Sequence, residues 1–397
     1  MNINKKAYEL GSKRSIIREI FEYSKVRAAE IGADKVFDFS LGNPSVEPPK
    51  EVSRAIKDLL DNENSTALHG YTSAQGDFTV RKTISDSIND KFGLNLSAND
   101  IYMTCGAAAS LSICLKAVFN EGDECIVFAP FFTEYRVFVQ NAGGTLVVSN
   151  PEEKTFQINV EDFESKITPK TKAVIINSPN NPSGVVYTED TISKVCEILE
   201  RKQKEYNKVI YLIADEPYRE LVYNDINVPY LMNYYNNTLI CYSYSKSLSL
   251  PGERIGYIAV NPLMIDSKDV YLAVCGAGRS LGYVCAPSMF QKVVMSCINA
   301  KVNISAYKEN RDLIYNALTE YGFECVKPDG AFYLFVKSPF KNATEFYEKA
   351  KQYEILVVPC DDFGVNGYVR IAYCVDNNRI KNSLPAFKAL AKDCGLI

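Results

Sequence analysis

VIYLIADEPYRELVY (209–223) begins with six apolar or aromatic residues and turns polar at Asp215. A short run that is apolar on both faces is typical of a strand in the buried centre of a parallel sheet. Open parallel sheets place their ligand sites at the carboxyl ends of the strands. The segment therefore predicts a buried strand that delivers Asp215 to a site.

Six further runs of the same kind lie on either side of this segment, and helical patterns such as TEDTISKVCEILERKQ (188–203) separate several of them. These runs are IYMT (101–104), CIVFA (125–129), TLVVS (145–149), AVIIN (173–177), TLICYS (238–243) and IGYIAV (255–260). Strands that alternate with helices predict an α/β fold with a largely parallel sheet covered on both sides.

The C-terminal third has a different pattern. SAYKENRDLIYNALTEYG (305–322) predicts a long helix, and NRIKNSLPAFKALAKDCG (378–395) predicts a final one. Between them, FECVKPDGAFYLFVK (323–337) predicts two strands around a Pro-Asp-Gly turn. We therefore expect a smaller α+β unit, packed closely on the first because no long linker separates them.

The composition excludes several classes of function. The 397 residues are 47% hydrophobic and 23% charged, as in a globular protein with a large core. The net charge of −4 lacks the basic excess that nucleic-acid binding needs. No run approaches the roughly 18 apolar residues of a membrane span, and the N-terminal sequence has no apolar signal segment. We expect neither a nucleic-acid nor a membrane partner.

The chain has a single histidine, His69, which excludes sites built on two or three histidines. A Ser-His-Asp triad would have to use His69, which we interpret as structural or interfacial. The twelve cysteines form no C-x-x-C motif and lie in apolar segments. We interpret them as reduced core residues and expect a cytoplasmic protein without a metal site.

Eight motifs, in this order along nearly the whole chain, resemble the fold-type I, pyridoxal-phosphate-dependent aminotransferases of classes I and II. They are FSLGNPS (39–45), YTSAQGDFTVRKTI (71–84), TCGAAAS (104–110), APFFTEY (129–135), NNPSG (180–184), DEPY (215–218), SYSKSLSLPGERIG (243–256) and GYVRIAY (367–373). The resemblance implies a large cofactor-binding domain (48–284) with a mostly parallel seven-stranded sheet between helices. It also implies that residues 1–47 form an N-terminal arm and part of the small domain (285–397).

The resemblance assigns the catalytic groups. It makes Lys246 the Schiff-base lysine, whose pKa neighbouring cations and partial desolvation would lower, keeping the amine nucleophilic. Asp215 would face the pyridine nitrogen of pyridoxal 5'-phosphate (PLP), because a protonated ring is the better electron sink. Tyr218 and Asn181 would hydrogen-bond the phenolic oxygen, and Phe132 would stack on the ring.

A helix start is the predicted phosphate site. Gly106, Ala107 and Ala108 open a predicted helix, whose free N–H groups and dipole suit a dianion. These positions carry neither the hydroxyl nor the lysine of many relatives, so backbone donors carry more of the contact. The resemblance adds Ser243, Ser245, Arg254 and, from a partner subunit, Tyr71. We therefore expect a homodimer with shared active sites.

Arg370 is the predicted substrate anchor. Its guanidinium lies in an apolar strand and needs an anionic partner, and the resemblance gives it the substrate's α-carboxylate. Gly42 and Asn181 would approach the same group. Arg279 lies near the position where some relatives supply a partner-subunit arginine for a second carboxylate. Whether Arg279 or His69 contacts substrate stays open.

The resemblance implies an aminotransferase that moves an amino group from an L-amino acid to a 2-oxo acid by a ping-pong route. A PLP-dependent β-lyase of the cystathionine or cysteine-conjugate type stays open, because the same site serves both reactions. A non-catalytic PLP-binding module is disfavoured because the catalytic residues are present. GAGRSLG (276–282) is one residue too long for the dinucleotide-binding fingerprint. The substrate does not follow from the motifs.

Overall fold

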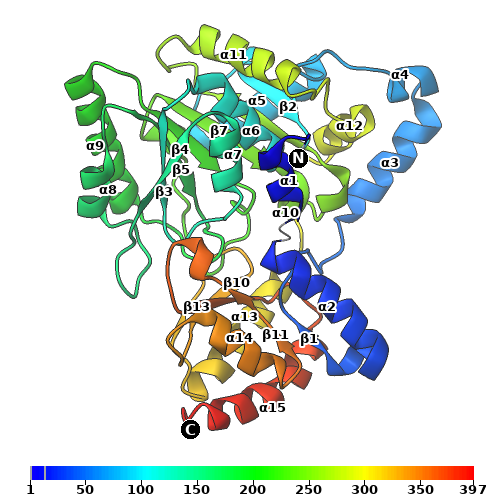
Figure 1. The fold of residues 1–397 in the computed structure, drawn as a ribbon. Helices are drawn as coiled ribbons and strands as arrows, with labels where there is room; N and C mark the ends of the chain where they lie inside the picture. Colours follow the sequence, from blue (N-terminus) through cyan, green and yellow to red (C-terminus); the bar gives the residue numbers. More distant parts are fainter. Residues whose placement is uncertain (1, 13–14) are drawn as a thin grey trace.

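The seven apolar runs form one sheet, as the sequence predicts. The computed structural model describes residues 2–12 and 15–397, and the sheet lies in the upper, larger part of the molecule (Figure 1). In spatial order its strands are β2 (Ile101–Thr104), β8 (Gly256–Val260), β7 (Thr238–Ser243), β6 (Tyr211–Asp215), β5 (Thr171–Asn177), β3 (Glu124–Phe128) and β4 (Thr145–Ser149). Only β8 runs antiparallel to its neighbours, which confirms the mostly parallel seven-stranded sheet.

Helices cover the sheets and join the strands. The α-helices of the described residues are α1 (Lys5–Ser12), α2 (Ile16–Ile31), α3 (Lys50–Asn62), α4 (Ser65–His69), α5 (Phe78–Phe92), α6 (Ala107–Val118), α7 (Tyr135–Asn141), α8 (Val160–Lys166), α9 (Glu189–Tyr206), α10 (Tyr244–Ser247), α11 (Ser267–Ser280), α12 (Ser288–Ser296), α13 (Ser305–Glu320), α14 (Ala343–Lys351) and α15 (Asn377–Asp393). Short 3₁₀ turns are η1 (Ala33–Lys35), η2 (Ala98–Asp100), η3 (Leu231–Asn233), η4 (Pro251–Glu253) and η5 (Asp361–Phe363). No helix of the described chain is long and apolar enough to cross a membrane.

Alternate residues of the large sheet enter two different cores. In β6, Tyr211 and Ile213 pack with α6, α7 and α11, whereas Leu212 and Ala214 pack with α3, α5, α8, α9 and α12. Successive side chains of a strand point to opposite faces, so a strand covered on both sides must be apolar throughout. This requirement explains the uninterrupted apolar runs in the sequence.

The smaller part combines both ends of the chain. Its antiparallel sheet has the order β12 (Val358–Pro359), β13 (Tyr368–Ala372), β10 (Tyr333–Lys337) and β9 (Cys325–Val326). Beside it, β1 (Phe37–Asp38) pairs in parallel with β11 (Ile355–Leu356). Ile20 and Phe39 from the N-terminal segment share a core with Ile314 and Phe387. The N-terminal segment is thus part of the smaller core, and α2 lies against it in Figure 1.

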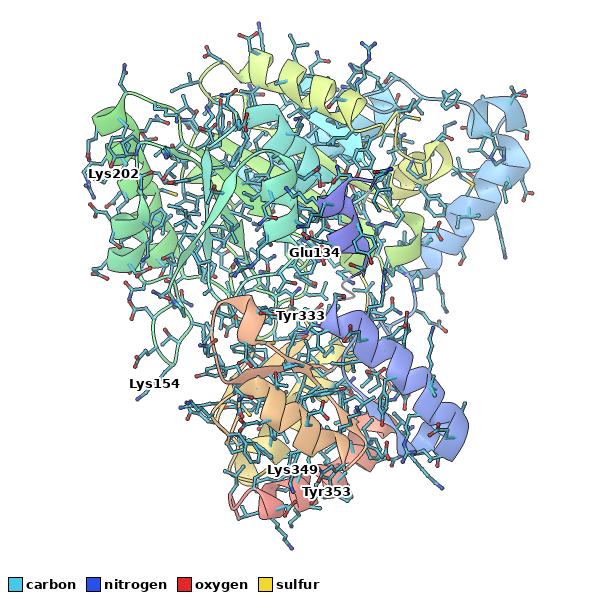
Figure 2. The ribbon with its side chains drawn as sticks, in the orientation of Figure 1. Glu134, Lys154, Lys202, Tyr333, Lys349 and Tyr353 are labelled. Atoms are coloured by element: carbon cyan, nitrogen blue, oxygen red, sulfur yellow. The ribbon has the colours of Figure 1, made fainter. Side chains whose placement is uncertain are left out.

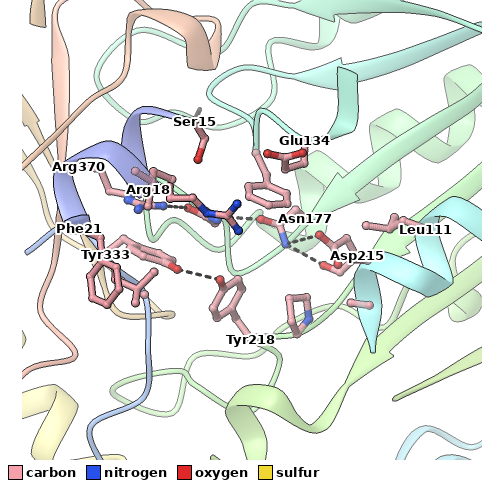
Figure 3. Close-up of a pocket in the computed structure, with 18 residues that line it drawn as sticks. Ser15, Arg18, Phe21, Leu111, Glu134, Asn177, Asp215, Tyr218, Tyr333 and Arg370 are labelled. Atoms are coloured by element: carbon pink, nitrogen blue, oxygen red, sulfur yellow. Dashed lines mark hydrogen bonds between the residues drawn. The ribbon is translucent and has the colours of Figure 1, made fainter. Parts of the chain in front are cut away.

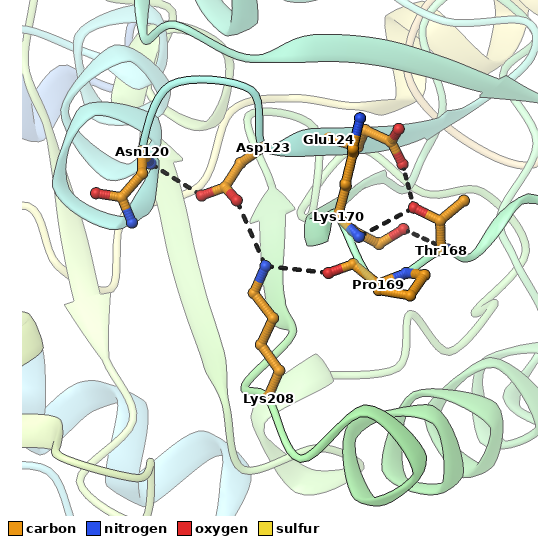
Figure 4. A network of polar contacts seen from close by, with 8 residues as sticks. Asn120, Asp123, Glu124, Thr168, Pro169, Lys170 and Lys208 are labelled. Atoms are coloured by element: carbon orange, nitrogen blue, oxygen red, sulfur yellow. Dashed lines mark hydrogen bonds and ion pairs between the residues drawn. The ribbon is translucent and has the colours of Figure 1, made fainter.

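The two ends of the large sheet differ in chemistry. At the carboxyl ends, Asn177 of β5 pairs with Asp215 of β6, and α10 follows β7 directly. At the amino ends, a polar network joins loops before β3, β5 and β6 (Figure 4). There Lys208 Nζ lies 3.5 Å from Asp123 Oδ1 and donates to the Pro169 carbonyl at 3.2 Å. This network ties the loops together at the edge of the sheet opposite the carboxyl ends of the strands.

The GAGRSLG segment does not form a loop between a strand and a helix. Residues 276–280 are the last turn of α11, and Gly278 packs against Tyr102. A Cβ at Gly278 would lie 2.2 Å from the Tyr102 hydroxyl oxygen, so this glycine permits close packing of α11 on β2. The segment therefore has a packing role.

Candidate active site

A cavity of about 520 Å³ opens at the carboxyl ends of the large sheet. It lies between the two parts of the molecule, where Figure 2 places Glu134 and Tyr333. Eight of the predicted site residues line it: Gly42, Ala107, Ala108, Phe132, Asn181, Asp215, Tyr218 and Arg370. The structure thus brings together side chains from five separate motifs (Figure 3).

Asp215 lines the cavity, and the two oxygens of its carboxylate differ in their hydrogen bonding. Its side chain is 5% exposed, and Tyr135 Oη donates a hydrogen bond of 2.5 Å to Oδ2. Asn177 Nδ2 donates to the Asp215 carbonyl oxygen at 2.9 Å, whereas Asp215 Oδ1 is buried and has no hydrogen-bond partner among the described residues. Burial raises the pKa of Asp215 to about 7, although the Tyr135 hydrogen bond lowers it.

Lys246 reaches the cavity wall from α10. Its Nζ donates a hydrogen bond of 2.7 Å to the Gly42 carbonyl oxygen. The pKa of Lys246 is lowered to about 8, mainly by desolvation and also by the positive charges of Arg254 and Arg370, while the Cys374 thiol acts in the opposite direction. Near neutral pH the amine of Lys246 is therefore neutral, and nucleophilic, far more often than that of an ordinary lysine.

The predicted phosphate residues lie together at the start of α6. Gly106 has φ of 90°, and a Cβ there would lie 2.9 Å from Arg254 Nη2. A Cβ at Gly256 would lie 3.0 Å from Gly106 Cα and 3.3 Å from Ser243 Cα, so these segments are neighbours. Ser243 Oγ and Ser245 Oγ are 2.8 Å apart. The cluster offers hydroxyls, a guanidinium and the first N–H groups of a helix.

Arg370 is buried with one donor unused. It is 2% exposed, and its Nη1 and Nη2 donate to Asn181 Oδ1 at 3.0 Å and to the Ser40 carbonyl at 2.7 Å. Its guanidinium lies 4.6 Å from the centre of the Tyr333 ring. Nε has no hydrogen-bond partner in the part of the chain that the structure describes. A buried cation with a free donor is suited to an anionic ligand.

Eight residues considered in the sequence analysis are not part of the cavity wall. Five of them, Gly106, Ser243, Ser245, Lys246 and Arg254, belong to the neighbouring groups described above, whereas Tyr71, His69 and Arg279 are exposed elsewhere. Tyr71 is 89% exposed, and the cavity wall includes neither it nor the exposed His69 and Arg279. Tyr71 does not line the cavity of its own chain, so the predicted contact with the phosphate would require a second chain.

Sequence reasoning missed five residues around the cavity. Tyr135 lies inside the quoted motif APFFTEY, and Asn177 ends the run AVIIN, so strand-end position could have indicated both. Tyr333 Oη lies 3.0 Å from Tyr218 Oη, but nothing in AFYLF distinguishes it from a core tyrosine. Arg18 and Glu134 also line the cavity, and only the tertiary structure shows them there.

The free groups of the cavity fit PLP. The unpartnered Asp215 Oδ1 can accept a hydrogen bond from a protonated ring nitrogen, and Lys246 offers an amine of lowered pKa. The helix start beside Arg254 suits a phosphate. Fold and site together define a PLP-dependent enzyme of fold type I.

Comparisons with known proteins give the family. The sequence profile of "Aminotransferase class I and II" matches residues 34–387. A probable aspartate aminotransferase of Methanocaldococcus jannaschii is 30% identical over 95% of this chain and 97% of its own length. An aromatic-amino-acid aminotransferase of Thermococcus litoralis is 25% identical over 96% of this chain and 97% of its own length. A crystal structure of an aminotransferase from Eubacterium rectale is 54% identical, with a TM-score of 0.97 and 99% of both chains covered.

The chain belongs to the class I and II aminotransferase family. It is a PLP-dependent transferase that moves an amino group between an amino acid and a 2-oxo acid.

Proposed function

We propose that Lys246 and Asp215 are the catalytic pair of this aminotransferase, with Tyr218 beside them. The observation that carries the proposal is the unpartnered oxygen of Asp215 in the cavity whose wall Lys246 reaches. Lys246 would bind the cofactor and then move the proton at substrate Cα. Its lowered pKa suits both tasks, because the neutral amine is the nucleophile and the base.

The remaining polar groups would hold the cofactor. When bound, PLP supplies an electron sink that stabilises negative charge at substrate Cα. Asp215 Oδ1 would accept the hydrogen bond of the ring nitrogen, Tyr218 and Asn181 would contact the phenolic oxygen, and Phe132 would stack on the ring. The phosphate would be bound by Gly106, Ala107, Ala108, Ser243, Ser245 and Arg254.

Arg370 would orient the substrate by binding its α-carboxylate. The free Nε of Arg370 adds a charge-assisted donor, while Asn181 and Ser40 fix the guanidinium plane. Gly42 lies between Lys246 and the tyrosine that packs on Arg370. Its carbonyl oxygen accepts a hydrogen bond from Lys246, and a Cβ at this position would collide with the Tyr333 hydroxyl. The carboxylate would thus be held beside the group that moves the Cα proton.

Two assignments concern the whole chain. We propose an N-terminal arm and part of the small domain in 1–47, a large domain from 48 and a small C-terminal domain. The expected boundary at 284 would divide α12 from the large core into which it packs, which favours a boundary after α12.

We also propose a cytoplasmic location, because all twelve cysteines are free thiols, which persist in a reducing compartment.

We propose a homodimer with Tyr71 at a shared active site. Tyr71 is 89% exposed, so its ring is free to pack against another chain. Gln291 and Ser288 of α12 hydrogen-bond the Tyr71 segment at Thr72 and Leu68, which holds this segment in place. A second copy packed on this segment would bury Tyr71 and place it at the other chain's phosphate.

A single-turnover measurement tests this function. The PLP-loaded protein, mixed with an amino acid and no acceptor, should release one 2-oxo acid per site, without ammonia. Adding a 2-oxo acid should allow continued turnover. Lys246→Ala should lower the rate about 1,000-fold or more, because both nucleophile and base are lost.

Lys194→Ala is the matched control, since Lys194 is an exposed residue of α9 paired with Asp190. It should keep the wild-type rate. Release of pyruvate and ammonia from cysteine-type substrates, without continued turnover on a 2-oxo acid, would show a β-lyase. Near-normal turnover of Lys246→Ala would overturn the site assignment.

A further inference from the structure

The first turn of α2 contributes one side of the active-site cavity. Ser15, Ile17, Arg18 and Phe21 line it, whereas Ile20 on the opposite face of the helix is 1% exposed in the smaller core. Arg27, further along α2, fixes the helix through Glu354, with Nη2 2.6 Å from Oε1. Packing and this ion pair hold α2 with its first turn over the cavity.

Arg18 is a free cation in this wall. Within residues 2–12 and 15–397, its guanidinium has neither a hydrogen bond nor an ion pair. Figure 3 shows the Arg18 side chain reaching into the same space as Arg370, Asn177 and Asp215. In contrast, Arg370 is buried, and two of its nitrogens donate hydrogen bonds to Asn181 and Ser40. The cavity therefore contains a second guanidinium whose donors are all available.

The neighbouring wall lets a substrate side chain reach Arg18. Ile17, Phe21, Leu41 and Phe132 are apolar, and Glu134 is the one further charged group in this region of the lining. Ala107 and Ala108 place no cation at the start of α6. A side chain that leaves Cα beside Arg370 and Lys246 thus meets apolar walls and, among the residues that the structure describes, the unpaired cation of Arg18.

We infer that Arg18 is the specificity-determining residue that binds the side-chain carboxylate of acidic amino acids and 2-oxo acids, an inference that rests on the proposed orientation of the substrate by Arg370. A planar guanidinium binds a carboxylate through two parallel hydrogen bonds. The first N–H groups of α2 add positive potential at the same place. Glu134 repels the same carboxylate and limits its affinity. Neutral side chains use the apolar wall and leave Arg18 in water.

The test compares aspartate with phenylalanine in single-turnover kinetics of the PLP-loaded enzyme. Arg18→Gln should lower kcat/KM for aspartate about 10- to 100-fold, mainly through KM, because the carboxylate is bound before and during the reaction. Phenylalanine should react within about twofold of wild type. Arg18→Lys should restore only part of the loss, because it keeps the charge but not the two parallel hydrogen bonds. Glu134→Gln should lower KM for aspartate.

Binding of succinate, a dicarboxylate without an amino group, gives a readout independent of turnover. Calorimetry on the PLP-loaded enzyme should show about 10- to 100-fold weaker binding in Arg18→Gln, and added salt should weaken wild-type binding more than that of the variant. Lys35→Gln is the control, because Lys35 is an exposed cation of η1, just after α2, and lies outside the cavity lining. It should leave both measurements unchanged.

The outcomes separate this inference from the proposed function. An unchanged aspartate-to-phenylalanine ratio in Arg18→Gln, or equal losses for both substrates, overturns the role of Arg18 while transamination stands. A wild-type enzyme that takes neutral amino acids but not acidic ones also overturns it. A wild-type enzyme that transfers no amino group from either substrate overturns the proposed function itself.

Discussion

The two carboxylate oxygens of Asp215 have different surroundings, and this difference has consequences without any ligand. Oδ2 accepts from Tyr135, whereas Oδ1 is buried and unpaired. A buried carboxylate without full hydrogen bonding is costly when charged, so its pKa rises to about 7. The cofactor-free protein must therefore take up a proton at Asp215 or lose stability.

We predict a pH-dependent stability difference between the cofactor-free wild type and Asp215→Asn. Aspartate titrates near pH 4 in the unfolded chain and at about 7 in the fold, so between these values the folded state binds more protons. Stability from this group is present below pH 4 and falls as pH rises to 7. From pH 5 to 7, the wild type should lose about 2–3 kcal/mol relative to the variant.

Urea unfolding of both proteins at several pH values measures this difference. The subtraction removes the titration of all other groups, provided that the variant folds. Two stability curves that stay parallel between pH 5 and 7 would show that Asp215 titrates normally, and the account of its burial would be wrong.

Tyr333 shows how a residue acquires a role only from its neighbours. Its hydroxyl lies 3.0 Å from that of Tyr218, and its ring lies under Arg370. Residue 333 thus links the group expected at the cofactor with the group expected at the substrate. Its own sequence context, a buried strand of the small sheet, is that of many core tyrosines.

At the scale of single elements, the packing of α11 requires a glycine at position 278 but not at position 276. Gly278 is buried against Tyr102, whereas Gly276 in the same helix has open space around the position of a Cβ. Glycine is a poor helix former, so its presence in a helix needs a packing reason. Of these two glycines, only Gly278 has such a packing reason.

We predict opposite effects for two substitutions in α11. Gly278→Ala should lower the free energy of unfolding by about 1–3 kcal/mol, because the methyl group would strike Tyr102. Gly276→Ala should leave it unchanged or raise it by up to about 1 kcal/mol. Urea unfolding of the two variants beside wild type checks this. Equal effects of both would mean that α11 does not pack on Tyr102 as closely as described.

At the scale of the whole molecule, the site is complete only with a second chain under our proposal. Tyr71 would bind the phosphate of the other subunit, while Lys246 and Arg370 serve their own. An isologous dimer gives two equivalent shared sites related by a two-fold axis. Sedimentation should therefore show a dimer as the active species.

Mixed dimers give a sharper prediction. Tyr71→Ala should weaken retention of the cofactor, and Lys246→Ala should abolish turnover. When the two variants are unfolded and refolded together, half of the dimers are mixed, and each has one intact site. Activity should rise to about a quarter of the wild-type value.

The matched control mixes Lys246→Ala with Arg370→Ala. Both residues come from the same chain in each site, so mixed dimers contain no intact site and activity should stay low. Recovery in this control, or no recovery with Tyr71→Ala, would contradict the shared site. A fully active monomer would contradict the dimer.

The sequence by itself determined much of this protein. Runs apolar on both faces can be buried only between two layers of helices, so AVIIN and VIYLIA predicted the sheet, and the polar residues after them predicted its active edge. The motif around Lys246 and the resemblance it carries named the candidate cofactor and substrate residues, eight of which line one cavity. These features are local, because the alternation of side chains in a strand, the start of a helix and the composition of a motif each depend on a few neighbouring residues.

Only the tertiary structure decided which distant side chains meet. Arg18 and Tyr333 reach the cavity because α2 and the small sheet pack beside the carboxyl ends of the large sheet, whereas Glu134 reaches it from the N-terminus of α7. The unpaired atoms of Asp215 and Arg370 depend on burial by segments up to 330 residues apart. The lowered pKa of Lys246 was already expected from the resemblance, and the structure confirms its direction. Burial and charge environment are properties of the packed chain, so no local pattern encodes them.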